Sequence, residues 1–180
     1  EEGKALQAAV VSICHEAGIA LNGPNCMGIL NPVNRTTTYM QEVRDAARLN
    51  GNVGLISQSG SVCIGMLADL RRFGYSHVIS SGNEAVVTLV DYLDVLIDEP
   101  ATKVIGLFIE SVRNPERFVA ALDRAANAGK PVVVLKVGRS ARTQRAVTSH
   151  TGGLAGESRV FSEIVRSHRA IEVDDLDAFT

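Results

Sequence analysis

Apolar positions from about residue 51 onward follow two patterns, short continuous runs and helical spacing, which alternate along the chain. The continuous runs predict strands at 53–56, 77–80, 104–109, 132–137 and 170–173. Between them, apolar residues three and four apart predict helices at about 61–73, 88–97, 115–128 and 154–167. Strands without polar alternation are typical of a parallel sheet that is buried on both faces. The pattern therefore predicts an α/β fold, a doubly wound parallel sheet of flavodoxin-like strand order.

Two helix ends carry the residues expected there. Asn114 and Pro115 stand where an N-cap and a first helical residue are expected, and Gly129 stands just past the end of that helix, before Pro131. These signals fix the limits of the helix at 115–128.

Residues 1–46 show a less regular pattern and are interpreted as a short N-terminal appendage to the domain at 47–180. An amphipathic helix ends at Gly18, a short strand is expected at 19–21, and a turn-rich run follows at 22–28. Because this is too little to build a core, we expect it to be the end of a preceding domain. The chain also begins at Glu1 inside the expected helix, so we expect it to be a piece of a longer polypeptide.

Composition narrows the function classes. With a net charge of −2, 4% aromatic residues and no Trp, the chain gives no reason to expect binding to nucleic acid or to an anionic membrane. Its apolar runs are too short to cross a bilayer. Three cysteines, an odd number without metal-type spacing, predict no metal site and a reduced, cytoplasmic location.

Polar residues follow the predicted strands at their carboxyl ends, where doubly wound sheets bind ligands. The loops at the other edge of the predicted sheet contain fewer polar and reactive side chains. The polar segments are Ser57–Ser61, Ser80–Glu84, Glu110–Ser111, and Lys136–Arg139 with the basic loop that leads to His150. This asymmetry predicts a site at the carboxyl edge.

His150 lies among small residues and glycines, between a basic loop and a predicted helix. That position suits an imidazole that meets a phosphoryl group, although a loop histidine bound to a backbone carbonyl is an alternative. The run Ser59-Gly60-Ser61 precedes a helix, where free N–H groups bind anions, unless Ser59 is only an N-cap. Glu110 would accept the other ring N–H of His150, or reach solvent as a strand-end acid.

Taken together, these segments resemble the NDP-forming acyl-CoA synthetases, meaning ADP-forming acetate–CoA ligases and the α subunit of succinyl-CoA synthetase. The resemblance covers nearly the whole chain, and its pieces fall in order. They are Gly23-Pro24-Asn25-Cys26-Met27-Gly28, Val53-Gly54-Leu55-Ile56-Ser57-Gln58-Ser59-Gly60, Ser81-Gly82-Asn83-Glu84, Ile109-Glu110, and Lys136-Val137-Gly138-Arg139-Ser140 leading to Ser149-His150-Thr151-Gly152-Gly153-Leu154-Ala155-Gly156.

The resemblance implies an acid–thiol ligase that works through an acyl phosphate and a phosphohistidine. His150 matches the phosphorylated histidine and Glu110 the acid that orients it. Phosphate or acyl phosphate would be held by the two small-residue segments, and Asn25 and Cys26 match the segment beside the thiol end of coenzyme A. The phosphate-binding residues are Ser59, Gly60, Ser61, Gly152 and Gly153.

The resemblance also implies partners. Residues 1–46 would be the C-terminal remnant of a Rossmann-type CoA-binding domain, and residues 47–180 a flavodoxin-like phosphohistidine domain. ATP or ADP with Mg would come from an ATP-grasp domain or β subunit, so we expect an oligomer and an inactive isolated chain. Ser149 and Thr151 flank the histidine, whereas succinyl-CoA synthetases have Gly and Ala. This favours the acetate–CoA ligase branch and leaves the small carboxylic acid substrate open.

Two other functions compete with the ligase. The order Ser59, Glu110, His150 is that of an α/β-hydrolase triad, but the glycines two residues to either side of the nucleophile are missing. The other is a CoA-binding or regulatory module of the same fold without turnover. The presence of His150 together with Glu110 argues against such a module.

Overall fold

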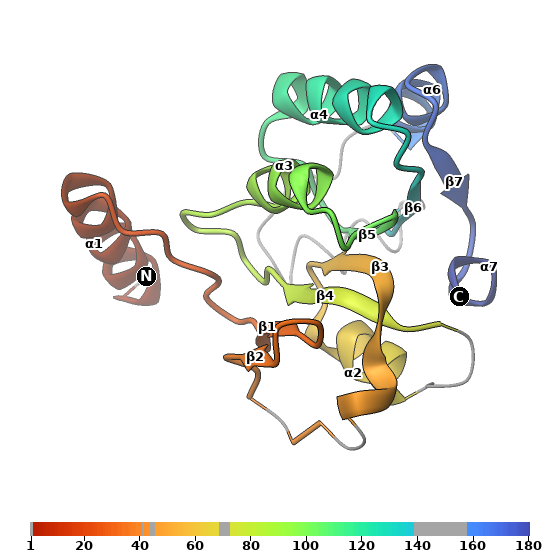
Figure 1. Cartoon of the computed structure of the whole chain (residues 1–180). Coiled ribbons are helices and arrows are strands. Elements are labelled where there is room, and N and C mark those ends of the chain that lie inside the picture. Colours follow the sequence, from red (N-terminus) through yellow and green to blue (C-terminus); the bar gives the residue numbers. More distant parts are fainter. Residues whose placement is uncertain (1, 41, 44–45, 69–72, 139–157) are drawn as a thin grey trace.

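The computed structural model describes residues 2–40, 42–43, 46–68, 73–138 and 158–180 (Figure 1). These residues form one seven-stranded sheet in the order β2-β1-β4-β3-β5-β6-β7. The strands are β1 (Gly28–Asn31), β2 (Thr36–Thr37), β3 (Asn50–Ser57), β4 (Tyr75–Ser80), β5 (Val104–Ile109), β6 (Val132–Lys136) and β7 (Ile171–Val173). The helices are α1 (Glu2–Ala17), η1 (Ala46–Leu49, a 3-10 helix), α2 (Gly60–Ala68), α3 (Leu89–Asp98), α4 (Pro115–Asn127), α6 (Ser158–Ser167) and α7 (Leu176–Phe179).

The five strands β4-β3-β5-β6-β7 are parallel neighbours, which confirms the predicted flavodoxin-like order. In this register Ser57 of β3 pairs with Ser80 of β4 and with Phe108 of β5, and Lys136 of β6 pairs with Ile109. The strands therefore end level with one another. The loops that follow them begin side by side at one edge of the sheet.

Helices cover both faces of the sheet, and each face has its own apolar core. One core joins residues of α3, α4 and α6 to the sheet, including Leu93, Phe118 and Val165. The second lies on the opposite face and includes Met66 of α2 and Phe179 of α7. Figure 1 shows these helices on opposite sides of the strands. Burial on both faces explains why the strands have continuous apolar runs.

The predicted helix ends are confirmed. The Asn114 side chain accepts a hydrogen bond from the Arg117 amide at 3.0 Å, with Pro115 as the first helical residue of α4. Gly129, at φ +67°, follows the last turn of the same helix. Among the described helices, none has the length and apolarity that a membrane span requires.

The N-terminal residues differ from expectation. The prediction of a strand at 19–21 is wrong, because these residues form no strand. Instead β1 adds to the sheet edge antiparallel to β4, and β2 pairs with β1. The helix α1 is present, but Leu6 and Ile13 of its apolar stripe are about 60% exposed. Figure 1 shows α1 apart from the sheet.

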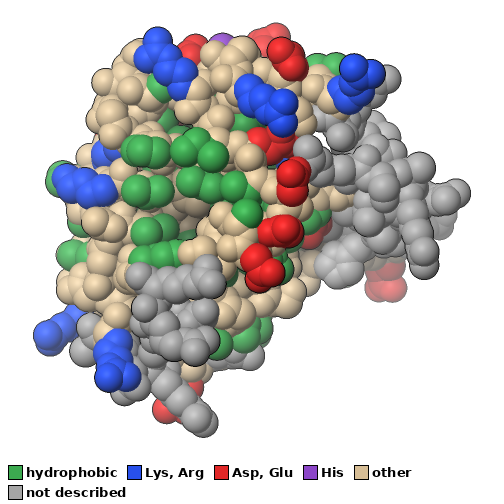
Figure 2. All heavy atoms as spheres, turned by 90° about the vertical axis from the view of Figure 1, so that its right-hand side faces the viewer, with side chains coloured by type: hydrophobic (Ala, Val, Ile, Leu, Met, Phe, Trp, Pro, Cys, Tyr) green, Lys and Arg blue, Asp and Glu red, His purple; other side chains and the backbone are tan. Residues whose placement is uncertain are grey.

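The strand β7 forms the other edge of the sheet. Figure 2 views the molecule from this side and shows apolar side chains gathered in the middle of the face, with acidic side chains beside them. Ile171 of β7 is 54% exposed and Leu176 of α7 is 46% exposed. Ile171 begins β7, so it lies at the end of the strand away from the carboxyl edge.

Replacing Leu107, which is fully buried in β5, tests the central strand. We expect Leu107→Ala to lower the free energy of unfolding by about 2–5 kcal/mol, because it leaves a cavity in the core. Leu6→Ala, at a position 62% exposed, is the matched control and should change it by less than about 0.5 kcal/mol. Denaturant unfolding measures both. Equal effects of the two substitutions would contradict the burial described here.

Candidate functional site

The turn between β3 and α2 is held by serine side chains. The Ser57 hydroxyl donates to the Ser59 carbonyl at 2.8 Å and accepts from the Ser59 amide at 3.1 Å. The hydroxyls of Ser59 and Ser61 lie 3.0 Å apart, and α2 begins at Gly60. Since the first amides of a helix have no partner within it, and Ser61 is exposed, this turn suits an anion.

Glu110 follows β5, and its main chain is bound by two side chains. The Gln58 carboxamide oxygen accepts from the amides of Glu110 and Ser111, at 2.6 and 2.9 Å. The Gln58 carboxamide nitrogen donates to the Ser111 carbonyl at 2.7 Å. On the other side, the Lys136 ammonium donates to the Glu110 carbonyl at 2.8 Å. Glu110 is thus attached to both β3 and β6.

The loop after β4 contains a buried acid, Glu84, which is only 4% exposed. Its Oε1 accepts from the Ser81 hydroxyl at 2.8 Å, and its Oε2 has no hydrogen-bond partner among the described residues. Burial raises the pKa of Glu84, while the polar side chains of Gln58 and Ser81 and the charge of Arg113 partly oppose this. Glu84 has a left-handed backbone, φ +54°, which is unusual for a residue other than glycine.

The segment Asn22–Cys26 runs alongside this loop. The Asn22 side-chain amide donates to the Ser80 carbonyl at 3.2 Å and to the Cys26 sulfur at 3.4 Å. It accepts in turn from the Tyr92 hydroxyl at 2.9 Å. Burial and nearby acidic groups raise the pKa of Tyr92 to about 12, so this hydroxyl keeps its proton and remains a donor. Cys26 is therefore fixed through Asn22 to β4 and α3.

Gly82 brings the two segments into close contact. A Cβ at Gly82 would lie 2.4 Å from the Pro24 carbonyl oxygen and 2.5 Å from that of Asn25. The Asn83 amide donates to the Pro24 carbonyl at 2.9 Å, and the side chains of Asn25 and Asn83 are hydrogen bonded at 3.2 Å. Only glycine fits at position 82, and Asn25 stays exposed at the rim.

These groups meet around a small pocket of about 10 Å³ at the carboxyl edge. Its lining combines the loops after β3, β4 and β5, namely Gln58, Gly82, Asn83, Glu110, Ser111 and Arg113. Arg113 spans the loops by donating to the Asn83 carbonyl at 2.8 Å. The structure therefore brings Glu110 together with the loop that binds Asn25, and the Ser59–Ser61 turn follows Gln58 directly.

Three of the predicted site residues, His150, Gly152 and Gly153, lie outside the described residues. The predicted helix start near 154 lies there too, as do the arginines of the basic loop. The described part of the site is therefore the carboxyl edge of strands β3, β4, β5 and β6.

Several residues of this site have no role that the sequence pattern predicts. Gln58, Lys136 and Asn22 lie within longer polar or turn-rich segments, and Arg113 belongs to none of the predicted site segments. Lys136 did carry a signal, because a lysine that ends the apolar run 132–135 and is 7% exposed needs acceptors. The role of Gln58 depends on strand register, which the sequence pattern does not give.

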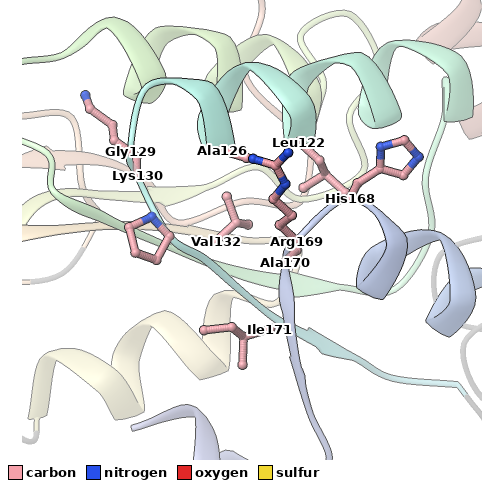
Figure 3. A pocket seen from close by; sticks show the side chains of 10 residues that line it. Leu122, Ala126, Gly129, Lys130, Val132, His168, Arg169, Ala170 and Ile171 are labelled. Atoms are coloured by element: carbon pink, nitrogen blue, oxygen red, sulfur yellow. The ribbon is translucent and has the colours of Figure 1, made fainter.

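A larger pocket, of about 340 Å³, lies where β6 and β7 begin, at the opposite edge (Figure 3). Two of its polar side chains are already engaged. The Lys130 ammonium donates to the carbonyls of Leu96 and Glu99, at 3.1 and 2.7 Å. His168 lies 2.7 Å from the Asp123 carboxylate. These contacts join neighbouring helices, so the two polar side chains of the pocket have a structural role.

Residues 50–180 match the family described as succinyl-CoA ligase like flavodoxin domain. The chain belongs to this family. It is 35% identical to a trans-feruloyl-CoA synthase from an unknown prokaryotic organism, over 98% of this chain and 26% of that protein. It is 33% identical to subunit alpha of an ADP-forming acetate–CoA ligase II from Pyrococcus furiosus, over 98% of this chain and 38% of that subunit.

A solved structure is also similar. It is that of a dinucleotide forming acetyl-coenzyme A synthetase 1 from Ca. Korarchaeum cryptofilum, in complex with phosphate and ADP. The TM-score is 0.88 at 30% identity, over 97% of this chain and 38% of that one. The resemblance expected from the sequence is thereby confirmed. The chain spans between about a quarter and two-fifths of the length of these relatives.

Gly82→Ala tests the contact between the loop after β4 and the segment 22–26. We expect a loss of stability well above about 2 kcal/mol, since the new methyl group meets two carbonyl oxygens in addition to the cost of a positive φ. Gly129→Ala is the control, because Gly129 also has a positive φ but open space around it. It should lose only about 1–2 kcal/mol. Thermal unfolding compares the two, and an equal loss would refute the close contact.

Glu84→Gln tests the buried carboxyl group. Because the pKa of Glu84 is raised in the folded state, its contribution to stability is full below the ordinary pKa and is lost as the pH rises through the raised value. The unsubstituted protein should therefore lose stability relative to Glu84→Gln between acid and neutral pH. Unfolding free energies measured at several pH values give this difference. A difference independent of pH would contradict the burial of a titrating group.

Proposed function

We propose that this chain is part of an NDP-forming acyl-CoA synthetase of the ADP-forming acetate–CoA ligase type, and that His150 carries the phosphoryl group. The observation that supports this most strongly is the attachment of Glu110 by Gln58 and Lys136 at the same edge as the turn Ser59–Ser61, which suits an anion. Family membership and the three similar proteins above support the same reaction class.

In this proposal Glu110 accepts the N–H of one ring nitrogen of His150, so that the other nitrogen is the nucleophile. That nitrogen takes a phosphoryl group, the bond from phosphorus to the leaving oxygen breaks, and the transfer reverses when a new acceptor arrives. A carboxylate beside the ring stabilises the positive charge that the imidazole gains. Ser59, Gly60 and Ser61 would bind phosphate oxygens through helix-start amides, together with Gly152 and Gly153.

Coenzyme A would supply the thiol, and the residues that would hold its thiol end are Asn25 and Cys26. The chain offers a suitable surface there, because Asn25 is exposed, Cys26 is half-buried, and Asn22 and Asn83 hold both. Residues 1–46 would then be the end of a Rossmann-type CoA-binding domain, and 47–180 the phosphohistidine domain. An ATP-grasp domain or β subunit would supply ATP or ADP with Mg, within a cytoplasmic oligomer that acts on a small carboxylic acid.

A serine hydrolase fits less well. A nucleophile elbow needs a strained turn at the serine. Among the described residues, the left-handed non-glycine positions are Asn25, Arg35, Glu84 and Arg169, and Ser59 is not one of them. The Ser59 hydroxyl also pairs with Ser61. A regulatory module without turnover would leave the attachment of Glu110 without a purpose.

The deciding experiment is phosphorylation of the complete protein, including its nucleotide-binding part, with radiolabelled ATP. We expect an acid-labile phosphate on His150, none in His150→Asn, and a rate lowered about 100-fold in Glu110→Gln, because the imidazole loses its orientation. His168→Asn is the matched control, since His168 lies at the opposite edge and pairs with Asp123. It should be labelled normally.

A phosphate that is stable to acid, or one that persists in His150→Asn, would refute the proposal. A covalent adduct of a serine-directed phosphonate on Ser59 would favour the hydrolase. Acyl-CoA synthesis by the isolated chain would contradict its dependence on an ATP-grasp partner.

A further inference from the structure

The Gln58 side chain makes an unusual set of contacts for a residue that directly follows a strand. It is 8% exposed, and its carboxamide forms three hydrogen bonds to the main chain 52 and 53 residues further on. Its oxygen accepts from Glu110 and Ser111, and its nitrogen donates to Ser111. The oxygen and the nitrogen of the Gln58 carboxamide thus both form hydrogen bonds to the main chain just after β5.

The same backbone is bound from the opposite side. Lys136 is 7% exposed, and its ammonium donates to the carbonyls of Glu110 at 2.8 Å and Val137 at 2.5 Å. The Glu110 N–H therefore binds a side chain from the end of β3, and its C=O binds one from the end of β6. Because the peptide groups on both sides of Glu110 are held, its φ and ψ are restricted, and so is the direction of its side chain.

We propose that Gln58 is a positioning residue that fixes the Glu110 carboxylate for its contact with the imidazole of His150. This inference rests on the function proposed above. Gln58 touches main-chain atoms of Glu110, so it acts on the position of the carboxylate rather than on its charge. The rate of a reaction is sensitive to displacements of a reacting group by about 1 Å. Loss of the main-chain clamp, meaning the three hydrogen bonds from Gln58 to the backbone of Glu110 and Ser111, would permit such displacements.

Glutamine suits this position for a chemical reason. Ser111 presents an N–H and a C=O to the same side chain, so the clamp needs an acceptor and a donor. A carboxylate would put an oxygen where the donor stands, 2.7 Å from the Ser111 carbonyl, and methionine has the length but neither group.

The test measures single-turnover phosphorylation of His150 by ATP in the complete protein. Four proteins are compared, namely the unsubstituted protein, Gln58→Met, Glu110→Gln and the double variant. We expect Gln58→Met to slow phosphoryl transfer about 10- to 100-fold without changing the ATP concentration that gives half the maximal rate. In the Glu110→Gln background it should slow the reaction less than about twofold further, because its effect passes through the carboxylate.

Gln7→Met is the matched control, since Gln7 is exposed on α1, and it should leave the rate unchanged. Gln58→Asn keeps the amide but is one methylene shorter, and it covers the case in which Gln58→Met does not fold. We expect an intermediate rate with the same dependence on Glu110. If Gln58→Met instead caused a general structural defect, it would slow phosphoryl transfer by the same factor in the Glu110→Gln protein as in the unsubstituted protein.

Failure of this inference is distinct from failure of the proposed function. If the unsubstituted protein forms no phosphohistidine, the proposed function is refuted, and the inference with it. If His150 is labelled normally but Gln58→Met matches the unsubstituted rate, only the role of Gln58 is refuted. If the rate losses of Gln58→Met and Glu110→Gln multiply in the double variant, the role of Gln58 is refuted as well.

Discussion

The level ending of the parallel strands is the constraint on which the site depends. Ser57 pairs with both Ser80 and Phe108, so β3, β4 and β5 reach the carboxyl edge together. Main-chain groups that leave a sheet at such an edge are still partly buried and need partners. Gln58 and Lys136 supply them for the turn after β5, and the same hydrogen bonds that satisfy the fold determine where Glu110 lies. Stability and positioning thus arise from one set of contacts.

The segment 22–28 completes this edge from outside the parallel sheet. β1 continues it as an antiparallel strand on β4, while Gly82 allows the backbone of Pro24 and Asn25 to approach within contact distance of the loop after β4. Tyr92 reaches the same segment from α3 through Asn22. Cys26 and the pocket beside Glu110 are therefore fixed to one scaffold, although Cys26 and Glu110 lie 84 positions apart in the sequence. The reaction proposed for this chain, which joins a thiol to an activated acyl group, would require such a fixed relation between distant segments.

Local sequence patterns predicted those features that local physics determines. Continuous apolar runs gave β5 its bounds, and Asn114, Pro115 and Gly129 gave α4 its ends, because burial on both faces and capping are properties of neighbouring residues. The strand expected at 19–21 failed for the opposite reason. Three apolar residues do not form a strand without a partner edge, and Leu21 instead accepts one hydrogen bond from the Val87 amide. The clamp of Gln58 on residues 52 and 53 positions away likewise depends on register and lies beyond any local pattern.

The loop 81–84 shows how the edge sustains a strained residue. Glu84 adopts a left-handed backbone and buries a carboxyl group, both of which cost free energy, and such features persist only where surrounding contacts determine the conformation. The Ser81 hydroxyl binds that carboxyl group, Gly82 lies against the segment 24–25, and Arg113 binds the Asn83 carbonyl. Each residue of the loop thus has a separate attachment, and relaxation of Glu84 would have to break several of them at once. A loop held in this way gives Glu110 a fixed neighbour, because Gly82 and Asn83 line the same pocket as Glu110.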